Sequence, residues 1–253
     1  MGGTPGTLRV GTSGFSYASW APRFYPTGLA AARRLGVYAE RLDAVELNST
    51  FYRRPTERQL AIWAEATPPS FRFAVKAQRG ATWRAFRSED PAASLRWLCE
   101  PLPGLGGRLG TVLLRVPDDL PRDDARLDAV LEAWPAGIPL VVEARDPSWH
   151  VDETFARLRA VGAVLCATDL DGSPAPDLRV TGPLVYLRLR RVSYDADDVE
   201  TWAARLTPFL ADGLDVYVFL RHDDDGASAL TAEALAQATA ASVDREARLS
   251  TGG

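Results

Sequence analysis

The sequence predicts an α/β protein built as a single (β/α)8 TIM-type barrel. Eight short apolar segments alternate with longer segments of helical periodicity along the chain. Eight is also the number of parallel strands that closes such a barrel. No dinucleotide-binding fingerprint follows the first strand, because the glycine spacing of "GTSGFS" (residues 11–16) does not match one. A doubly wound open sheet is the alternative architecture.

The expected strands are short apolar runs bounded by turn residues. In chain order they are residues 8–13, 44–49, 71–76, 111–116, 139–144, 163–168, 184–189 and 215–220. The clearest helix candidates, with apolar residues three and four apart, are residues 29–42, 123–134, 152–162 and 198–213. Gly137, Gly162 and Gly213 give helix stop signals just before a strand. The sixth connection, residues 169–183, is rich in turn residues, so its helix is expected to be irregular or missing.

One domain of this kind accounts for the whole chain. Residues 8–240 are expected to form the barrel, and residues 1–7 and 244–253 to form flexible tails. The hydrophobic content of 46% and the charged content of 25% are those of an ordinary soluble protein. A net charge of −4 argues against a dedicated nucleic-acid coat protein, although it permits a local basic groove.

The cysteines and the apolar segments indicate in which cellular compartment the protein is expected. Cys99 and Cys166 are far apart and lack metal-ligand spacing, so both are expected to be reduced thiols. The chain has no long apolar run and no signal peptide, so a cytoplasmic protein without a membrane partner is expected.

Polar residues fall where the predicted strands end, at the face that carries the active site in barrel enzymes. On the second strand, strict alternation places Glu46, Asn48 and Thr50 on one face. On the third strand, Phe73 would pack outward and Lys76 would point into the barrel mouth. The later strand ends add Arg115, Glu143, Arg145, Asp169, Arg188, Arg190 and either Arg221 or His222. Ion pairs of Glu46 with Lys76, and of Glu143 with Arg115 or Arg145, would explain part of this pattern without catalysis.

Lys76 is the only lysine in a chain with 28 arginines, and Asn48 is the only asparagine. High-GC codon usage disfavours lysine and asparagine. Where one of them is nevertheless present, the residue that the codon bias favours is a poor fit for that position, so Lys76 and Asn48 are candidate functional residues. Lysine differs from arginine because its pKa falls when it is buried or crowded, which lets it act as an acid or a Schiff-base amine.

Aromatic residues are concentrated in the first loop and after the second strand. Trp20 and Tyr25 belong to the first group, and Tyr52 belongs to the second. Such rings could stack on a sugar ring or a nucleobase, or they could cover the barrel as a hydrophobic plug.

Four segments resemble the signature segments of the domain of unknown function 72 (YecE-like) family. They are "GTSGFSYASWAPRFYP", "VELNSTFYRRPT", "FRFAVKA" and "VEARDPSW", and the resemblance covers residues 8–240. It implies a single TIM-barrel domain of bacterial and archaeal type and implies no particular activity. The site residues that the resemblance implies for this chain are Glu46, Asn48, Lys76, Glu143 and Arg145.

The chain departs from this family pattern in three places. Trp83 stands where members often have a histidine, and the seventh and eighth strands end in "RLRR" (188–191) and "LRHD" (220–223). Arg190 and His222 are therefore not carried over.

These residues together favour an enzyme, a hydrolase, lyase or isomerase, that applies acid–base chemistry to a small anionic or carbohydrate-like substrate. Glu143 or Glu46 would be the base, Lys76 the acid or electrophile, and Asn48 a polar anchor. The arginines would bind phosphate or carboxylate groups. Expected substrate contacts are Asn48, Thr50, Tyr52, Arg115, Arg145, Asp169, Arg188, Trp20 and Tyr25.

Two other classes stay open. One is a metal-dependent phosphodiesterase that holds Mg²⁺ or Mn²⁺ on Glu46, Glu143 and Asp169, although no cofactor is predicted as such. The other is a non-catalytic protein that binds nucleic acid or another polyanion, which the acidic composition disfavours.

Overall fold

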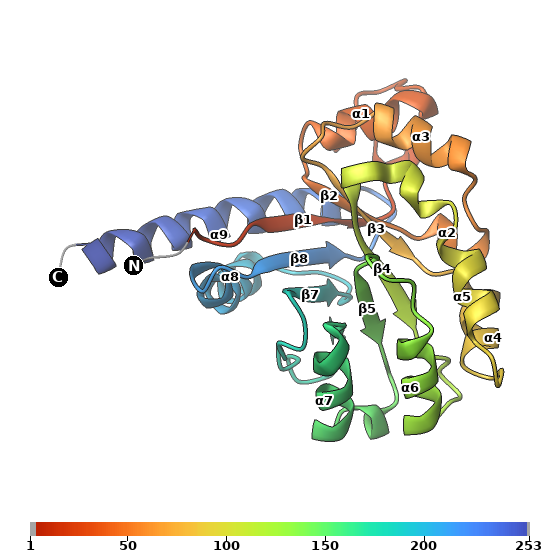
Figure 1. Cartoon of the computed structure of the whole chain (residues 1–253). Coiled ribbons are helices and arrows are strands. Elements are labelled where there is room, and N and C mark those ends of the chain that lie inside the picture. Colours follow the sequence, from red (N-terminus) through yellow and green to blue (C-terminus); the bar gives the residue numbers. More distant parts are fainter. Residues whose placement is uncertain (1–3, 252–253) are drawn as a thin grey trace. The chain divides into compact units, whose positions relative to one another are not determined.

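The computed structural model describes residues 4–251 (Figure 1). Within that range eight parallel strands close into a barrel in the order β1 to β8. Three strands match their predicted bounds, and the others differ by one or two residues at an end. The strands are β1 (Leu8–Ser13), β2 (Ala44–Leu47), β3 (Arg72–Lys76), β4 (Leu109–Arg115), β5 (Leu140–Glu143), β6 (Val164–Asp169), β7 (Leu184–Leu189) and β8 (Asp215–Leu220). The predicted α/β barrel is therefore confirmed.

Helices connect the strands except in one place. They are α1 (Arg34–Ala39), α2 (Ser49–Tyr52), α3 (Glu57–Glu65), α4 (Arg79–Ala85), α5 (Ala92–Cys99), α6 (Asp124–Glu132), α7 (Asp152–Val161), α8 (Ala196–Ala211) and α9 (Ala227–Thr251). Short 3-10 helices are η1 (Ala18–Trp20), η2 (Ala31–Arg33), η3 (Leu102–Arg108) and η4 (Pro147–Trp149). Residues 170–183, between β6 and β7, contain no helix, as the turn-rich sequence predicts.

The chain divides into two compact units. Unit 1 comprises the residues up to Val45, Thr168–Leu178, and the residues from Leu184 onward; unit 2 comprises Glu46–Ala167 and Arg179–Pro183. The single-domain organisation over residues 8–240 stays a prediction. Helix α9 continues through residues 244–251, which the sequence assigned to a tail, while residues 1–3 and 252–253 lie outside the described residues.

In unit 2, the strand alternation determines which side chains face the helices. The ring of Phe73 on β3 packs near Trp63 of α3, with 6.5 Å between the ring centroids. Lys76 has the opposite parity on the strand, so it points away from α3, as predicted. Lys76 pairs with Leu113 of β4, and Arg115 pairs with Glu143 of β5. Lys76, Arg115 and Glu143 thus share one side of the three strands.

A side chain of unit 2 bonds to β6 in the connection that lacks a helix. The hydroxyl of Thr181 accepts a hydrogen bond from the Leu165 amide at 2.8 Å and donates one to the Ala163 carbonyl at 2.9 Å. All three groups are buried, so this hydroxyl satisfies two backbone groups that would otherwise be costly to bury.

In unit 1, strand β1 lies very close to the backbone at Ala44. A Cβ atom added at Gly11 would lie 1.8 Å from the Ala44 carbonyl oxygen and 2.8 Å from the Tyr38 hydroxyl. The same hydroxyl donates to the Ala44 carbonyl and accepts from the Thr12 amide, which fixes the approach. Gly11 is therefore needed for packing and not for a phosphate-binding turn.

No helix within residues 4–251 has both the length and the apolar character that crossing a bilayer requires.

Candidate functional site

Lys76 lies at the carboxyl end of β3 in unit 2 and is buried. Its ammonium nitrogen is 4.3 Å from the centroid of the Phe51 ring, a cation–π contact. The Thr50 hydroxyl donates to the carbonyl of Lys76 at 2.7 Å and to that of Leu47 at 2.5 Å. The backbone that carries the only lysine is therefore held by a buried side chain of α2.

Glu143 lies at the end of β5 with an exposed fraction of 1%. Arg115 Nε is 3.9 Å from Glu143 Oε2, and Arg145 Nε is 3.9 Å from Glu143 Oε1. These distances are longer than hydrogen bonds, so the two guanidinium groups attract the carboxylate through space. A buried carboxylate flanked by two cations is therefore present at the end of β5.

Asp118, which the sequence analysis did not select, takes the direct bonds of Arg115. Arg115 Nη2 donates to Asp118 Oδ1 at 2.5 Å and also to Oδ2, and Nε donates to Oδ1 at 3.2 Å. Hydrogen bonding to Arg115 lowers the pKa of Asp118, and the charges of Arg115 and Arg145 act in the same direction. The only sequence signal was the position of Asp118, three residues beyond the end of β4.

A cavity of about 410 Å³ adjoins this cluster in unit 2. Its cationic lining comes from Arg79 and Arg115, and its aromatic lining from Phe51 and Trp83. Thr82, Val116, Pro117, Asp118 and Asp119 complete the lining. Arg79 was missed by the sequence analysis because it lies three residues past its strand, at the start of α4.

The end of β2 differs from the sequence-based expectation. The strand stops at Leu47, and Asn48 precedes the helix α2 that contains Thr50. The predicted shared strand face of Glu46, Asn48 and Thr50 is therefore wrong, because Thr50 lies on a helix and donates to backbone carbonyls. Glu46 is fully buried at the end of β2, and Tyr52 has an exposed fraction of 75%.

In unit 1, Asp169 belongs to a network that the sequence analysis missed. Its Oδ2 accepts from Arg191 Nε at 2.8 Å and from the Tyr194 hydroxyl at 2.9 Å, and Arg191 Nη2 donates to Asp198 at 2.7 Å. Burial raises the pKa of Tyr194, and its hydrogen bond to Asp169 acts in the same direction. Arg188, at the end of β7, is buried.

Trp20 and Tyr25 are buried in an aromatic cluster of unit 1. The Trp20 ring lies 5.5 Å from Phe24 and 5.9 Å from Tyr25, between centroids. The Trp20 indole donates to the Asp223 carbonyl at 2.9 Å, and the Tyr25 hydroxyl donates to the Phe15 carbonyl. These positions match the plug interpretation of the first loop, because the rings pack against one another.

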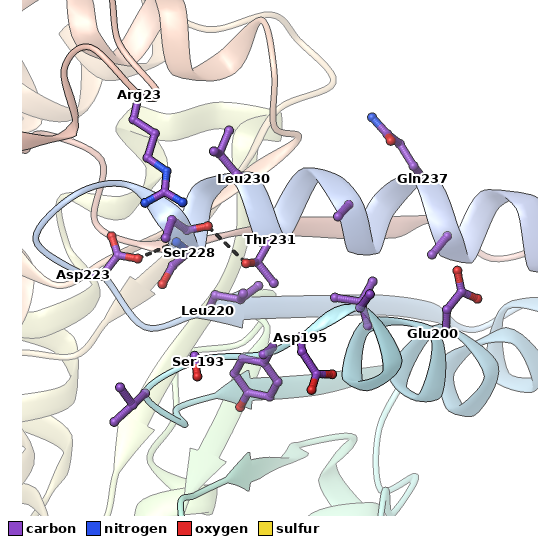
Figure 2. Close-up of a pocket in the computed structure, with 17 residues that line it drawn as sticks. Arg23, Ser193, Asp195, Glu200, Leu220, Asp223, Ser228, Leu230, Thr231 and Gln237 are labelled. Atoms are coloured by element: carbon purple, nitrogen blue, oxygen red, sulfur yellow. Dashed lines mark hydrogen bonds between the residues drawn. The ribbon is translucent and has the colours of Figure 1, made fainter.

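A cavity of unit 1 lies between α8 and α9 and measures about 680 Å³ (Figure 2). Three of its charged side chains, Arg23, Asp195 and Asp223, are bonded to the protein itself. Asp195 caps α8 through a capping box with Asp198, and Asp223 accepts from the Gly226 and Ser228 amides at the start of α9. Arg23 donates to Asp225.

Within residues 4–251, no three or more His, Cys, Asp or Glu side chains are grouped as metal ligands would be. His150 Nε2 instead lies 2.8 Å from the Ala144 carbonyl, and the His222 ring stacks on Tyr17 with 5.0 Å between centroids.

Comparison with known proteins shows to which protein family the chain is related. The model of the family described as "Protein of unknown function DUF72" matches residues 9–251. The chain belongs to the DUF72 family. The UPF0759 protein YunF of Bacillus subtilis (strain 168) is 24% identical over 243 residues, which cover 81% of this chain and 86% of YunF.

Solved DUF72 proteins have the same fold. A DUF72 family protein of Thermotoga maritima MSB8 is 26% identical, with a TM-score of 0.79 over 91% of this chain and 98% of that one. A DUF72 family protein of Enterococcus faecalis V583 is 18% identical, with a TM-score of 0.73 over 92% of this chain and 96% of that one. The second likeness shows the fold alone.

Proposed function

We propose that this DUF72 protein is an enzyme that applies acid–base chemistry to a small anionic substrate at the ends of β3, β4 and β5. Glu143 is assigned as the general base and Lys76 as the proton donor or electrophile. Arg115 and Arg145 bind the anionic group, Asn48 and Glu46 lie at the neighbouring strand end, and Arg79 extends the cationic lining.

The observation that carries the proposal is the buried Glu143 carboxylate between two arginines. Removing an ionised carboxylate from water costs several kcal/mol unless close partners compensate. At 3.9 Å the two guanidinium groups favour the charge of the carboxylate. A carboxylate positioned in this way at a strand end has the form expected of a general base.

Lys76 supports the proposal through its chemistry. It shares one side of the sheet with Glu143, and its ammonium is desolvated against the Phe51 ring. As a residue type, lysine can serve as a proton donor, whereas arginine remains charged. The position of the one lysine of the chain on the same side of the sheet as Glu143 supports the assignment of Lys76 as the proton donor or electrophile.

The lining of the unit 2 cavity supports the substrate class. Its volume of about 410 Å³ lies within the range of small-molecule sites. Arg79 and Arg115 match a phosphate or carboxylate group, and the Phe51 and Trp83 rings match the faces of a sugar or another flat group. A sugar phosphate or a small carboxylate meets these requirements.

The first test is a turnover screen of phosphate monoesters, hydroxy acids and glycosides, with and without added Mg²⁺ or Mn²⁺. For any substrate found, Glu143→Gln is expected to lower kcat by about 10²- to 10⁴-fold, because it removes the base and retains the shape. Glu132→Gln, an exposed position at the end of α6, is the matched control. Full turnover by Glu143→Gln would reject the assignment of the base.

Two variants of Lys76 distinguish a role of its positive charge from a role as a proton donor. Lys76→Arg retains the charge, and Lys76→Met removes it. Proton transfer by Lys76 is supported if both variants lose turnover. Inorganic phosphate should still shift the melting temperature of Lys76→Arg, which would show that this variant still binds an anion. If Lys76→Arg turns over normally, the lysine serves as a fixed charge and the proposed acid is wrong.

A further inference from the structure

The charge of the chain is unevenly distributed. Residues 49–97, within unit 2, contain nine lysines and arginines against four aspartates and glutamates, whereas the whole chain has a net charge of −4. A local basic segment in an acidic protein is the form expected of a surface that binds a polyanion.

Helix α2 contributes to two cavities in this segment. Phe51 lines the cavity of about 410 Å³ described above, together with Arg79 and Trp83. Ser49, Thr50 and Arg53 line a second cavity of about 390 Å³. The second cavity also contains Arg54, Pro55, Thr56, Arg58, Gln59, Ile62 and Trp63. Each cavity therefore has at least two arginines and at least one aromatic ring in its lining.

Exposed aromatic rings lie in the same segment. Among residues 4–251, the tyrosine, tryptophan and phenylalanine side chains that are classed as exposed are Tyr52, Trp83 and Trp97, at 75%, 51% and 41%. Tyr52 contacts Phe51, with 5.3 Å between centroids. The rings of Trp83 and Trp97 each have an arginine guanidinium over them, Arg87 at 4.9 Å and Arg54 at 4.7 Å.

We propose that this basic aromatic surface, defined by Tyr52, Arg53, Arg58, Arg79, Trp83 and Trp97, binds single-stranded nucleic acid. Unpaired bases present flat faces that stack on exposed rings, and the phosphates between them pair with arginines. A duplex keeps its base faces stacked internally, so it would offer no free base face to the three rings. The inference goes beyond the proposed function, because binding is independent of turnover.

Fluorescence anisotropy with labelled oligo-dT and oligo-U of about 12 nucleotides tests the proposal, because such lengths match common single-strand site sizes. Binding at low salt is expected, with log K falling linearly against log salt concentration. Arg53→Ala/Arg58→Ala is expected to weaken binding and to reduce the salt slope by about 0.7 for each arginine removed. Both side chains are exposed, so the fold is expected to be retained.

The matched control is Arg33→Ala/Arg159→Ala, which removes two exposed arginines outside residues 49–97 and should leave the slope unchanged. Tyr52→Ala is expected to weaken binding by about tenfold, and Tyr52→Phe to retain it, because stacking depends on the ring. Glu143→Gln should bind as the unaltered protein does, which separates this inference from the catalytic proposal.

Three outcomes would overturn the proposal. The first is the absence of binding to either oligonucleotide at low salt. The second is an Arg53→Ala/Arg58→Ala protein that binds like its control. The third is equal affinity for a duplex of the same length together with no effect of Tyr52→Ala, which would indicate charge attraction without base stacking.

Discussion

The cavity between α8 and α9 in unit 1 measures about 680 Å³, and the cavity beside β3 and β4 in unit 2 measures about 410 Å³. Two of the charged groups of the larger cavity, those of Asp195 and Asp223, hold helix ends. In the smaller cavity, Arg115 bonds to the exposed Asp118 and also lies 3.9 Å from the buried Glu143. The partners of the polar groups thus distinguish a candidate site better than its volume does.

The two regions also differ in the residues that surround them. The α9 side of the unit 1 cavity is lined mostly by small and aliphatic residues, such as Ala227, Leu230 and Ala234. The unit 2 cavity contains two arginines and two aromatic rings. Close helix packing accounts for the first composition, and the second matches the anionic substrate that we propose.

Gly11→Ala has the largest expected effect and tests the structural role of unit 1. The new Cβ atom would overlap the Ala44 carbonyl oxygen, so the backbone of β1 must shift. We expect a loss of about 3 kcal/mol or more in the free energy of unfolding, measured by urea denaturation. Gly107→Ala is the control, because nothing lies within 4 Å of its added Cβ. Equal stability of the two variants would contradict the close approach.

Asp223→Ala has an intermediate expected effect and probes the comparison directly. It removes the carboxylate that accepts two amide hydrogen bonds at the start of α9, which is worth about 1 to 2 kcal/mol. Asp224→Ala, at the neighbouring exposed position, is the control. Urea denaturation measures the difference, and phosphate binding should be unaffected. If Asp223→Ala had normal stability but altered phosphate binding, the unit 1 cavity would be the ligand site, contrary to our assignment.

The smallest expected effect is a change in the pKa of Asp118, in unit 2. Because Arg115 lowers its pKa in the folded state, the contact adds stability above pH of about 4 and loses it as the pH falls through the lowered value. Arg115→Gln should raise the pKa of Asp118 toward about 3.9, followed by carboxyl NMR titration. Arg96→Gln, on the exposed side of α5, is the control. An ordinary Asp118 pKa in the unaltered protein would contradict the bidentate contact.

Much of the fold was predictable because it depends on local patterns. The bounds of β1, β7 and β8 follow from apolar runs between turn residues, and the turn-rich residues 169–183 predicted an irregular or missing helix, which the structure confirms. The direction of Lys76 followed from alternation along β3. Such patterns act over a few neighbouring residues, so they can be seen without the tertiary structure.

The details of the site depend on contacts that local patterns do not contain. Thr50 was assigned to a strand because "VELNST" alternates, but the chain turns into α2 after Leu47. Nothing in the sequence showed that Arg115 bonds to Asp118, or that the Asp169 carboxylate accepts from Arg191 and Tyr194. Partner choice among many charged residues is decided by tertiary packing.

The single lysine gives the protein one further property. A lysine-specific endoprotease has only one bond to cut in this chain, between residues 76 and 77, and that bond is buried at the end of β3. Cleavage into fragments of residues 1–76 and 77–253 requires β3 to leave the sheet first. The rate at which the two fragments form therefore reports how often this part of the barrel opens.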